Sequence, residues 1–170
     1  MFQSIEYALS VRVFALVAAA ALLGGCALEA PAIKSRRGDV TGRAFEFQGG
    51  VDGEWNVRFR GDSFWCAFDQ QGKVRDYGSV KLTDAETVRL WDLVDAAELE
   101  RRKSSRRKAT DEDEPLYMFW SAPQEAGLRD VKPTMVEIWA DDVYEDRDLT
   151  RLVRYMKKMI QKYHKRRPVL

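Results

Sequence analysis

The sequence predicts an α+β domain in which two helices pack on one face of an antiparallel sheet. Two observations support this prediction. Short segments that alternate apolar and polar residues, separated by turn residues, indicate strands. Two longer segments have apolar residues at helical spacing. The expected order is about four strands, a helix, two strands and a helix, which favours a sheet with both helices on one side.

The first four strands are predicted from alternation and from the turns between them. AFEFQ at 44–48 and WNVRFR at 55–60 alternate, and the glycines between them indicate a tight connection. FWCAF at 64–68 follows a Gly-Asp turn, and residues 73–82 are expected to form the fourth strand. Together these segments predict an antiparallel meander.

The first helix is predicted to follow Thr83, because Thr83 and Glu86 have the spacing of a capping box. It should end near Arg101. Its apolar face is expected to contain Leu90, Leu93, Val94 and Ala97. Residues 101–114 form a basic block followed by an acidic block, which predicts an exposed loop.

The second half of the domain is predicted to contain two strands and a long helix. LYMFW at 116–120 and TMVEIWA at 134–140 are rich in strand-favouring residues. Acidic residues such as Asp146 precede the final helix and basic residues follow it, as its dipole favours. The apolar stripe of this helix is formed by Leu149, Leu152, Val153, Met156, Met159, Ile160 and Tyr163.

The N-terminal segment has the pattern of an export signal. Val13 to Leu23 is an apolar run, shorter than the roughly 20 residues that cross a bilayer. Leu23-Gly24-Gly25-Cys26 resembles the lipobox of bacterial lipoproteins. The resemblance implies cleavage before Cys26 and a diacylglyceryl group on its thiol. The alternative is an uncleaved membrane anchor.

This interpretation divides the chain into three parts. We expect a lipoprotein signal peptide at 1–25, a lipidated cysteine with a flexible linker at 26–43, and one α+β domain at 44–167. Several acyl chains make membrane attachment stable. Ala27 after the cysteine favours the outer membrane of a bacterial envelope, with the domain facing the periplasm.

Part of the chain resembles a group of bacterial proteins. The glycine-rich first hairpin, the Gly-Asp turn at 61–62 and the segment LTDAE at 82–86, which opens a helix, are similar to small uncharacterised bacterial envelope lipoproteins. The resemblance covers about 44–164. It implies the α+β architecture, but it supplies no activity and no functional residue.

Few residues are candidates for catalysis. The chain has one histidine, and His164 is expected to be solvated at a basic helix end. Of the two cysteines, Cys66 is expected to be buried, and lipid on Cys26 would leave it without a disulfide partner. These observations disfavour a hydrolase with a nucleophile and a histidine base.

The acidic clusters predict no metal site. Residues 111–114 form one cluster, and a second contains Asp141, Asp142, Glu145 and Asp146. Neither has the alternating ligands and central glycine of a calcium loop, so solvated carboxylates are the simpler interpretation. The sequence also has no phosphate-binding loop, and no cofactor is predicted.

Basic residues on the last helix are the main candidates for binding. Basic residues number 28 and acidic residues 27, so no overall field favours nucleic acid. A local cationic surface would fit anionic lipid headgroups, acidic envelope polymers or an envelope protein, and its alternative is a solubilising face. The residues are Arg151, Arg154, Lys157, Lys158, Lys162, Lys165 and Arg166.

The sequence therefore supports two functional hypotheses. The first is a membrane-anchored envelope lipoprotein whose domain binds another envelope component without catalysis, through its sheet face or its basic helix. The second is a periplasmic enzyme that works with carboxylates alone. Converging ionisable groups in a concave site would favour the enzyme.

Overall fold

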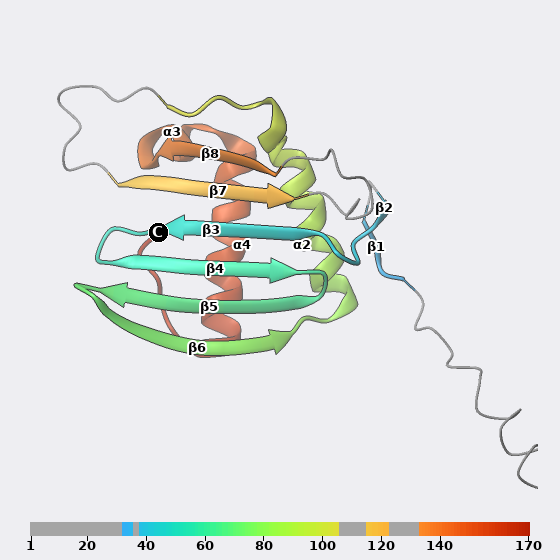
Figure 1. Cartoon of the computed structure of the whole chain (residues 1–170), viewed down its shortest axis with the longest axis horizontal. Coiled ribbons are helices and arrows are strands. Elements are labelled where there is room, and N and C mark those ends of the chain that lie inside the picture. Colours follow the sequence, from blue (N-terminus) through green and yellow to red (C-terminus); the bar gives the residue numbers. More distant parts are fainter. Residues whose placement is uncertain (1–31, 36–37, 106–114, 123–132) are drawn as a thin grey trace, which may run out of the picture. The chain divides into compact units, whose positions relative to one another are not determined.

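The domain is built on one six-stranded sheet (Figure 1). The computed structural model describes residues 32–35, 38–105, 115–122 and 133–170. The strands lie in the spatial order β6-β5-β4-β3-β7-β8, and every neighbouring pair is antiparallel. They are β3 (Ala44–Gly49), β4 (Glu54–Arg60), β5 (Ser63–Gln70), β6 (Lys73–Lys81), β7 (Leu116–Ala122) and β8 (Thr134–Trp139).

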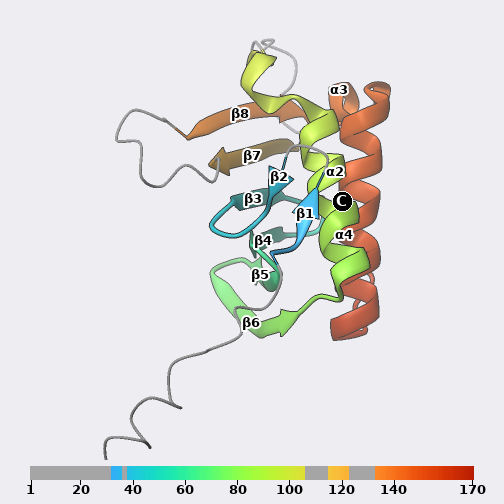
Figure 2. The same ribbon diagram turned by 90° about the vertical axis from the view of Figure 1, so that its right-hand side faces the viewer.

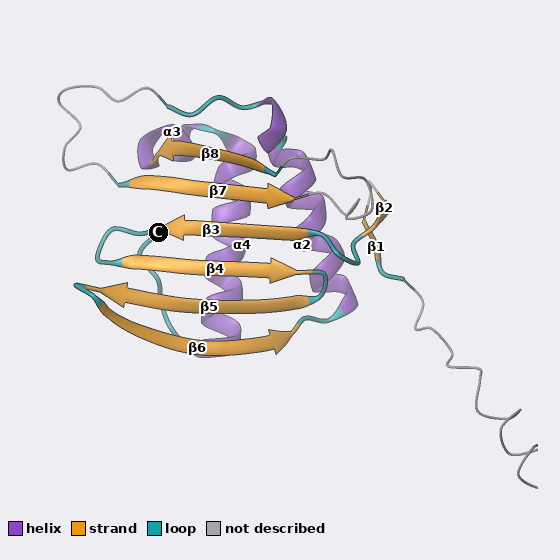
Figure 3. Cartoon of the chain, in the orientation of Figure 1, coloured by secondary structure: helices purple, strands orange, loops and turns teal. Residues whose placement is uncertain are grey.

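The helices cover one face of this sheet (Figure 2). The two long helices are α2 (Asp84–Ala97) and α4 (Arg147–His164). Two short elements, the 3₁₀ helix η1 (Leu99–Arg101) and α3 (Ala140–Glu145), follow α2 and β8 and were not predicted. Figure 3 shows the strands in orange, in front of the helices in purple. The predicted α+β fold, with two helices on one face of an antiparallel sheet, is confirmed.

The core lies between the sheet and the two long helices. Alternate residues of the central strands point toward the helices, and those side chains are buried. Burial of a side chain of this size contributes about 1.5 to 3 kcal/mol. The aromatic members are Phe45, Phe47, Phe59, Phe64, Tyr117 and Phe119, and the helices add Leu90, Trp91, Leu152 and Met156.

Helix α2 begins where the sequence predicts and ends earlier. The Thr83 hydroxyl accepts a hydrogen bond from the Glu86 backbone N–H, and the Glu86 carboxylate accepts one from the Thr83 N–H, which completes the capping box. Glu98 has a left-handed backbone conformation, with φ of 45°. The α-helix therefore stops before Glu98, and Arg101 belongs to η1.

Helix α4 is the predicted C-terminal helix, with its apolar stripe buried except for Tyr163, which is partly buried. Asp146 caps its start by accepting hydrogen bonds from backbone N–H groups, and Lys165 ends it with φ of 56°. The following residues form a tail, 165–170. The Val51 N–H donates to the Val169 carbonyl at 3.2 Å, and the Leu170 side chain is buried. The domain thus extends past residue 167 to Leu170.

The start of the domain also differs from the prediction. Residues 32–43 were expected to belong to a flexible linker, but β1 (Lys34–Ser35) and β2 (Gly38–Asp39) pair as a short antiparallel ladder. Val40 after them is buried. The compact unit begins at Ala32. The expected signal peptide and Cys26 lie outside the described residues.

An ion pair connects Arg43, which lies between the β1–β2 hairpin and β3, to Asp95 of α2. The Arg43 guanidinium is 2.5 Å from the Asp95 carboxylate, and both side chains are largely buried. The same guanidinium lies 4.5 Å from the centre of the Trp91 ring, and the Ser35 hydroxyl is 3.4 Å from Asp95. Removing the Asp95 carboxylate would leave the Arg43 guanidinium desolvated without this carboxylate, which is strongly destabilising.

We therefore expect Asp95→Ala to lower the free energy of unfolding by about 3 kcal/mol, because it leaves Arg43 buried and unpaired. The measurement is urea denaturation followed by circular dichroism. Asp84→Ala removes an exposed carboxylate from the same helix and should cost less than about 1 kcal/mol. The double change Arg43→Met with Asp95→Leu should recover most of the loss. If Asp95→Ala and Asp84→Ala lowered the free energy of unfolding equally, the stabilising role of the Arg43–Asp95 pair would be contradicted.

A second polar cluster links α2 to α4. The Glu86 carboxylate accepts hydrogen bonds from Lys162 at 2.5 Å and from the Tyr163 hydroxyl at 2.7 Å. Partial burial acts to raise the pKa of Glu86, but the hydrogen bonds from Lys162, Tyr163 and Thr83 outweigh it and lower this pKa to about 2. Folding therefore favours the ionised form of Glu86.

This shift predicts a pH dependence of stability. The contribution of Glu86 should be complete above its ordinary pKa of 4.5, and should be lost as the pH falls toward about 2. Glu86→Gln keeps a capping-box residue, so at neutral pH it should cost only the ionic part, about 1 to 2 kcal/mol. The difference between wild type and variant, measured by denaturation at several pH values, should shrink toward zero near pH 2. A difference that stays constant with pH would contradict this account.

Candidate functional site

The solvent-facing side of α4 carries a row of cations. We call Arg147, Arg151, Arg154, Lys158 and Lys165 the cationic surface of α4; all five are exposed. Their spacing places them opposite the buried stripe of the helix. One acidic residue, Asp148, lies beside them, with its carboxylate 3.5 Å from Arg151. The surface is therefore strongly positive over the length of the helix.

The predicted basic residues separate into three groups. Arg151, Arg154, Lys158 and Lys165 belong to the cationic surface of α4. Two others have structural partners: Lys162 pairs with Glu86, and the Lys157 ammonium donates to the Leu170 carbonyl at 3.0 Å. Arg166 belongs to the tail and lines a cleft on another side of the helix. The seven residues do not form one site.

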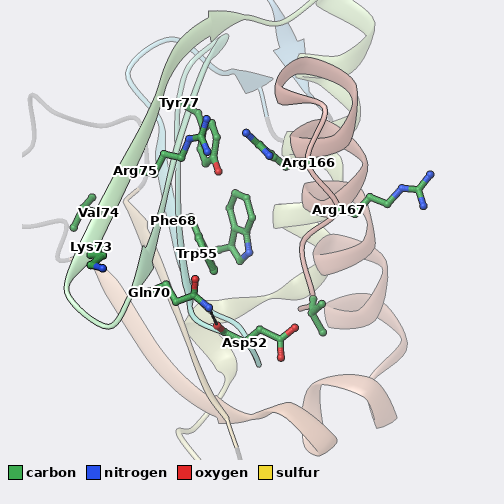
Figure 4. A pocket seen from close by; sticks show the side chains of 11 residues that line it. Asp52, Trp55, Phe68, Gln70, Lys73, Val74, Arg75, Tyr77, Arg166 and Arg167 are labelled. Atoms are coloured by element: carbon green, nitrogen blue, oxygen red, sulfur yellow. Dashed lines mark hydrogen bonds between the residues drawn. The ribbon is translucent and has the colours of Figure 1, made fainter.

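The cleft lies between the sheet and the tail, and its volume is about 570 Å³ (Figure 4). Strands β4, β5 and β6 supply one wall and the tail supplies the other. Trp55, Phe68 and Tyr77 form its aromatic floor. The Trp55 and Tyr77 ring centres are 5.7 Å apart with planes 14° from parallel, and Phe68 lies 4.9 Å from Trp55.

A bulge in β6 brings Tyr77 to this floor. Ser79 pairs with Trp65 and Asp76 with Ala67, so two residues of β6 lie opposite one residue of β5. Gly78 adopts φ of 77°, and its N–H donates to the Asp76 carboxylate at 2.7 Å. The bulge turns the Tyr77 ring toward the helix side of the sheet, where it packs against the core.

Two arginines flank the Tyr77 ring. The guanidinium carbons of Arg75 and Arg166 lie 5.4 Å and 5.6 Å from its centre. Within the described residues, neither guanidinium has a carboxylate within 4.0 Å. Asp52 lies toward the other end of the cleft (Figure 4). Apart from Asp52 the charged lining is cationic, so the cleft suits anion binding better than proton transfer.

His164 is not the solvated residue that the sequence predicts. Its ring lies 5.5 Å from Phe64 and 5.7 Å from Tyr77, and its Nε2 atom is buried without a hydrogen-bond partner. Burial lowers the pKa of His164, which favours the neutral ring. The expectation was wrong because the end of α4 still covers the sheet at this point.

Cys66 is buried, as predicted. Burial, together with the charge of Asp76, raises the pKa of its thiol to about 12. The thiol is therefore protonated at neutral pH and is shielded from solvent, and it lacks the properties of a catalytic nucleophile.

The second acidic cluster has structural partners in the fold. Asp146 accepts hydrogen bonds from the Leu149 N–H at 2.9 Å and from Arg102 at 2.7 Å. Partial burial opposes ionisation of Asp146, but these bonds lower its pKa overall. Asp142 accepts a hydrogen bond from the Ser105 hydroxyl at 2.7 Å. In the described ranges no three His, Cys, Asp or Glu side chains are placed to hold a metal, and 111–114 lie outside those ranges.

The outer face of the sheet combines aromatic and charged side chains. One row across the strands contains Met135, Trp120, Glu46, Arg58 and Trp65, from β8 to β5. The Arg58 guanidinium lies 4.9 Å from the Trp65 ring centre and 3.5 Å from Glu46. The charges in the middle of this row are therefore paired.

The cleft was not predicted from the sequence, although the aromatic residues that form its floor lie in predicted strands. Alternation in 55–60 and 64–68 was the available signal, since it places Trp55 and Phe68 on the buried face. Nothing local indicated that the tail would bring Arg166 to Tyr77.

The sequence matches no protein-family model and no curated protein. Among the described helices, none has both the length and the apolar character needed to cross a membrane. The functional interpretation therefore depends on the sequence around Cys26 and on the geometry of the described residues.

Proposed function

We propose that this chain is an exported bacterial lipoprotein, cut before Cys26, whose domain binds an anionic component of the envelope without catalysing a reaction. The observation that carries the binding proposal is the cationic surface of α4, whose five cations are exposed and include Arg151, which is paired with Asp148. For a domain attached by lipid, the anionic headgroups of the same bilayer are the closest partner of this charge.

The lipid anchor is supported by the N-terminal sequence. An apolar run precedes Leu23-Gly24-Gly25-Cys26, in the order that export and lipidation require. Ala27 supports transfer to the outer membrane, where the domain would face the periplasm. In such a protein the acyl chains provide attachment, and the cationic surface of α4 orients the domain on the membrane.

The alternative of an enzyme working with carboxylates gains no specific support. Asp146 and Asp142 are occupied in capping α4 and in binding Ser105. The aromatic cleft is a concave site, but Asp52 is the only carboxylate among the described residues that line it. Two carboxylates facing one cavity would be needed for acid and base chemistry of the glycosidase type.

The anchor predicts the effect of one substitution. Cys26→Ala should leave the precursor uncut or move the protein from the membrane fraction to the soluble fraction, because the lipid acceptor is lost. Cell fractionation and metabolic labelling with palmitate test this outcome. Cys66→Ala, at the other cysteine, should keep both the label and the membrane location. A Cys26→Ala protein that retains the label would contradict the proposal.

The cationic surface of α4 predicts binding to charged vesicles. Residues 27–170, prepared without lipid, should bind vesicles of phosphatidylglycerol in low salt and bind vesicles of phosphatidylcholine far less. The triple change Arg151→Gln, Arg154→Gln and Lys158→Gln should weaken this binding on the order of a hundredfold, at about 1 kcal/mol per cation. Added salt should reduce the wild-type affinity.

The matched control removes three cations from other surfaces, through Lys81→Gln, Arg89→Gln and Arg101→Gln. This control lowers the net charge by the same amount as the triple change in α4. It therefore distinguishes an effect of the cationic surface of α4 on vesicle binding from an effect of the total charge of the protein. If both triple variants lose the same affinity, the binding is not a property of α4.

A further inference from the structure

The turn from α4 into the tail contains the one histidine of the chain. His164 is the last residue of α4, and Lys165 follows it with φ of 56°, where the backbone leaves the helix. The His164 ring packs against Phe64 of β5 and Tyr77 of β6, and its Nε2 atom is buried without a hydrogen-bond partner. The protonation state of this ring therefore bears on the point at which the tail begins.

The tail is held firmly at its far end. The Val51 N–H donates to the Val169 carbonyl at 3.2 Å. The Lys157 ammonium donates to the Leu170 carbonyl at 3.0 Å, and the Leu170 side chain is buried. Residues 165–167, between these contacts and the end of α4, are exposed. The tail thus spans from the histidine at one end to the contacts of its last two residues at the other.

The surroundings of His164 suit a neutral imidazole. A protonated imidazole has an N–H on both nitrogens, so Nε2 would become a charged donor buried without an acceptor. Burial of the ring lowers the pKa of His164, in agreement with this geometry. Within the described residues, no carboxylate lies within 4.0 Å of the ring. The packed arrangement therefore loses stability when the ring takes up a proton.

The aromatic ring against which His164 packs already lies near two cations. The guanidinium carbons of Arg75 on β6 and Arg166 in the tail are 5.4 Å and 5.6 Å from the centre of the Tyr77 ring. Lys165, the next residue of the tail, adds another cation. A positive charge on the histidine would be repelled by these groups and not paired with them.

The acidic and neutral groups of the neighbouring elements have other partners. On β6, the Asp76 carboxylate accepts a backbone hydrogen bond within the bulge. On α4, the Tyr163 hydroxyl donates to the Glu86 carboxylate at 2.7 Å, and Lys162 pairs with the same carboxylate. On β5, burial raises the pKa of the Cys66 thiol to about 12, so it stays neutral. Among the described residues, these groups therefore give the histidine no ready counter-charge.

We propose that His164 is an acid-sensitive latch for the tail. With the ring neutral, the end of α4 stays packed on β5 and β6, and the tail remains in place as one wall of the cleft (Figure 4). When the ring takes up a proton from solvent, the last turn of α4 leaves its aromatic neighbours and the tail is released. The cleft then loses that wall, and its aromatic floor opens to solvent.

The sign of the pH dependence follows from the two environments of the ring. In the released tail the ring is solvated and has its ordinary pKa of 6.5, whereas burial lowers the pKa of the docked ring. The docked tail is therefore fully favoured above pH 6.5 and loses favour as the pH falls toward the pKa of the docked ring. Because one proton is taken up, the ratio of released to docked tail should rise by at most about tenfold per pH unit.

The test follows hydrogen exchange of the Val51 amide by NMR, in the full-length chain in non-ionic detergent. This N–H binds the Val169 carbonyl, so its protection reports the docked tail. After correction for the intrinsic effect of pH, its protection factor should fall about tenfold between about pH 7.5 and about pH 5. The amide of Phe47 in β3, at the centre of the sheet, should keep its protection. The single imidazole signal gives the pKa of His164, which should lie below 6.5.

Substitutions of the histidine should remove the pH dependence. His164→Phe keeps a ring and His164→Gln keeps a polar side chain, and neither can take up a proton in this range. In both variants the protection of Val51 should change by less than about twofold over the same pH range. The protection of Phe47 shows whether each variant is folded.

The matched control adds Gln161→His to His164→Phe. Gln161 is exposed on the last turns of the same helix, so the added imidazole titrates in water and not against the sheet. The chain again has one histidine, but the protection of Val51 should stay independent of pH.

The latch is contradicted by a pKa of His164 at or above 6.5, since protonation would then not weaken the docked state. It is also contradicted if the protection of Val51 is constant with pH, or if it falls equally in a variant that lacks the buried histidine. An equal fall for Phe47 would mean that the whole domain opens. These results depend neither on the lipid anchor nor on vesicle binding by α4, so the two proposals fail separately.

Discussion

The structure depends on the burial of one face of the six-stranded sheet. The central strands point aromatic side chains toward α2 and α4, and each helix places an apolar stripe against them. Each of these side chains contributes about 1.5 to 3 kcal/mol, more than an exposed ion pair supplies. Apolar contact therefore sets the position of the helices, and polar contacts such as that of Glu86 with Lys162 align them. The opposite side of α4 is left to solvent, which is where its cations lie.

The cleft lies beside the C-terminal end of α4. Lys165 ends the helix where it reaches β6, and the tail turns back from there toward the centre of the sheet (Figure 1). The tail then crosses this region and is held at its far end, where the Val51 N–H binds the Val169 carbonyl. Together with Trp55, Phe68 and Tyr77 of the sheet, the tail encloses a cavity that α4 does not fill.

Elements that depend on neighbouring residues could be predicted from the sequence, whereas features that depend on distant contacts could not. The capping box at Thr83 and the acidic residues at the start of α4 are local signals, and both long helices begin where these signals indicate. The hairpin of β1 and β2 was missed because its polar residues resemble a linker, and its contact through Ser35 with Asp95 spans 60 positions. The cleft was missed because the direction of Tyr77 depends on a bulge.

The position of β3 has a mechanical consequence for a chain that is pulled from its N-terminal side. Such a force first meets the short ladder of β1 and β2, which contains two residue pairs. It then reaches Arg43 and its bond to Asp95, and after that β3, which is paired on both sides by β4 and β7. The short ladder would therefore yield before the sheet, which such a force loads through a central strand.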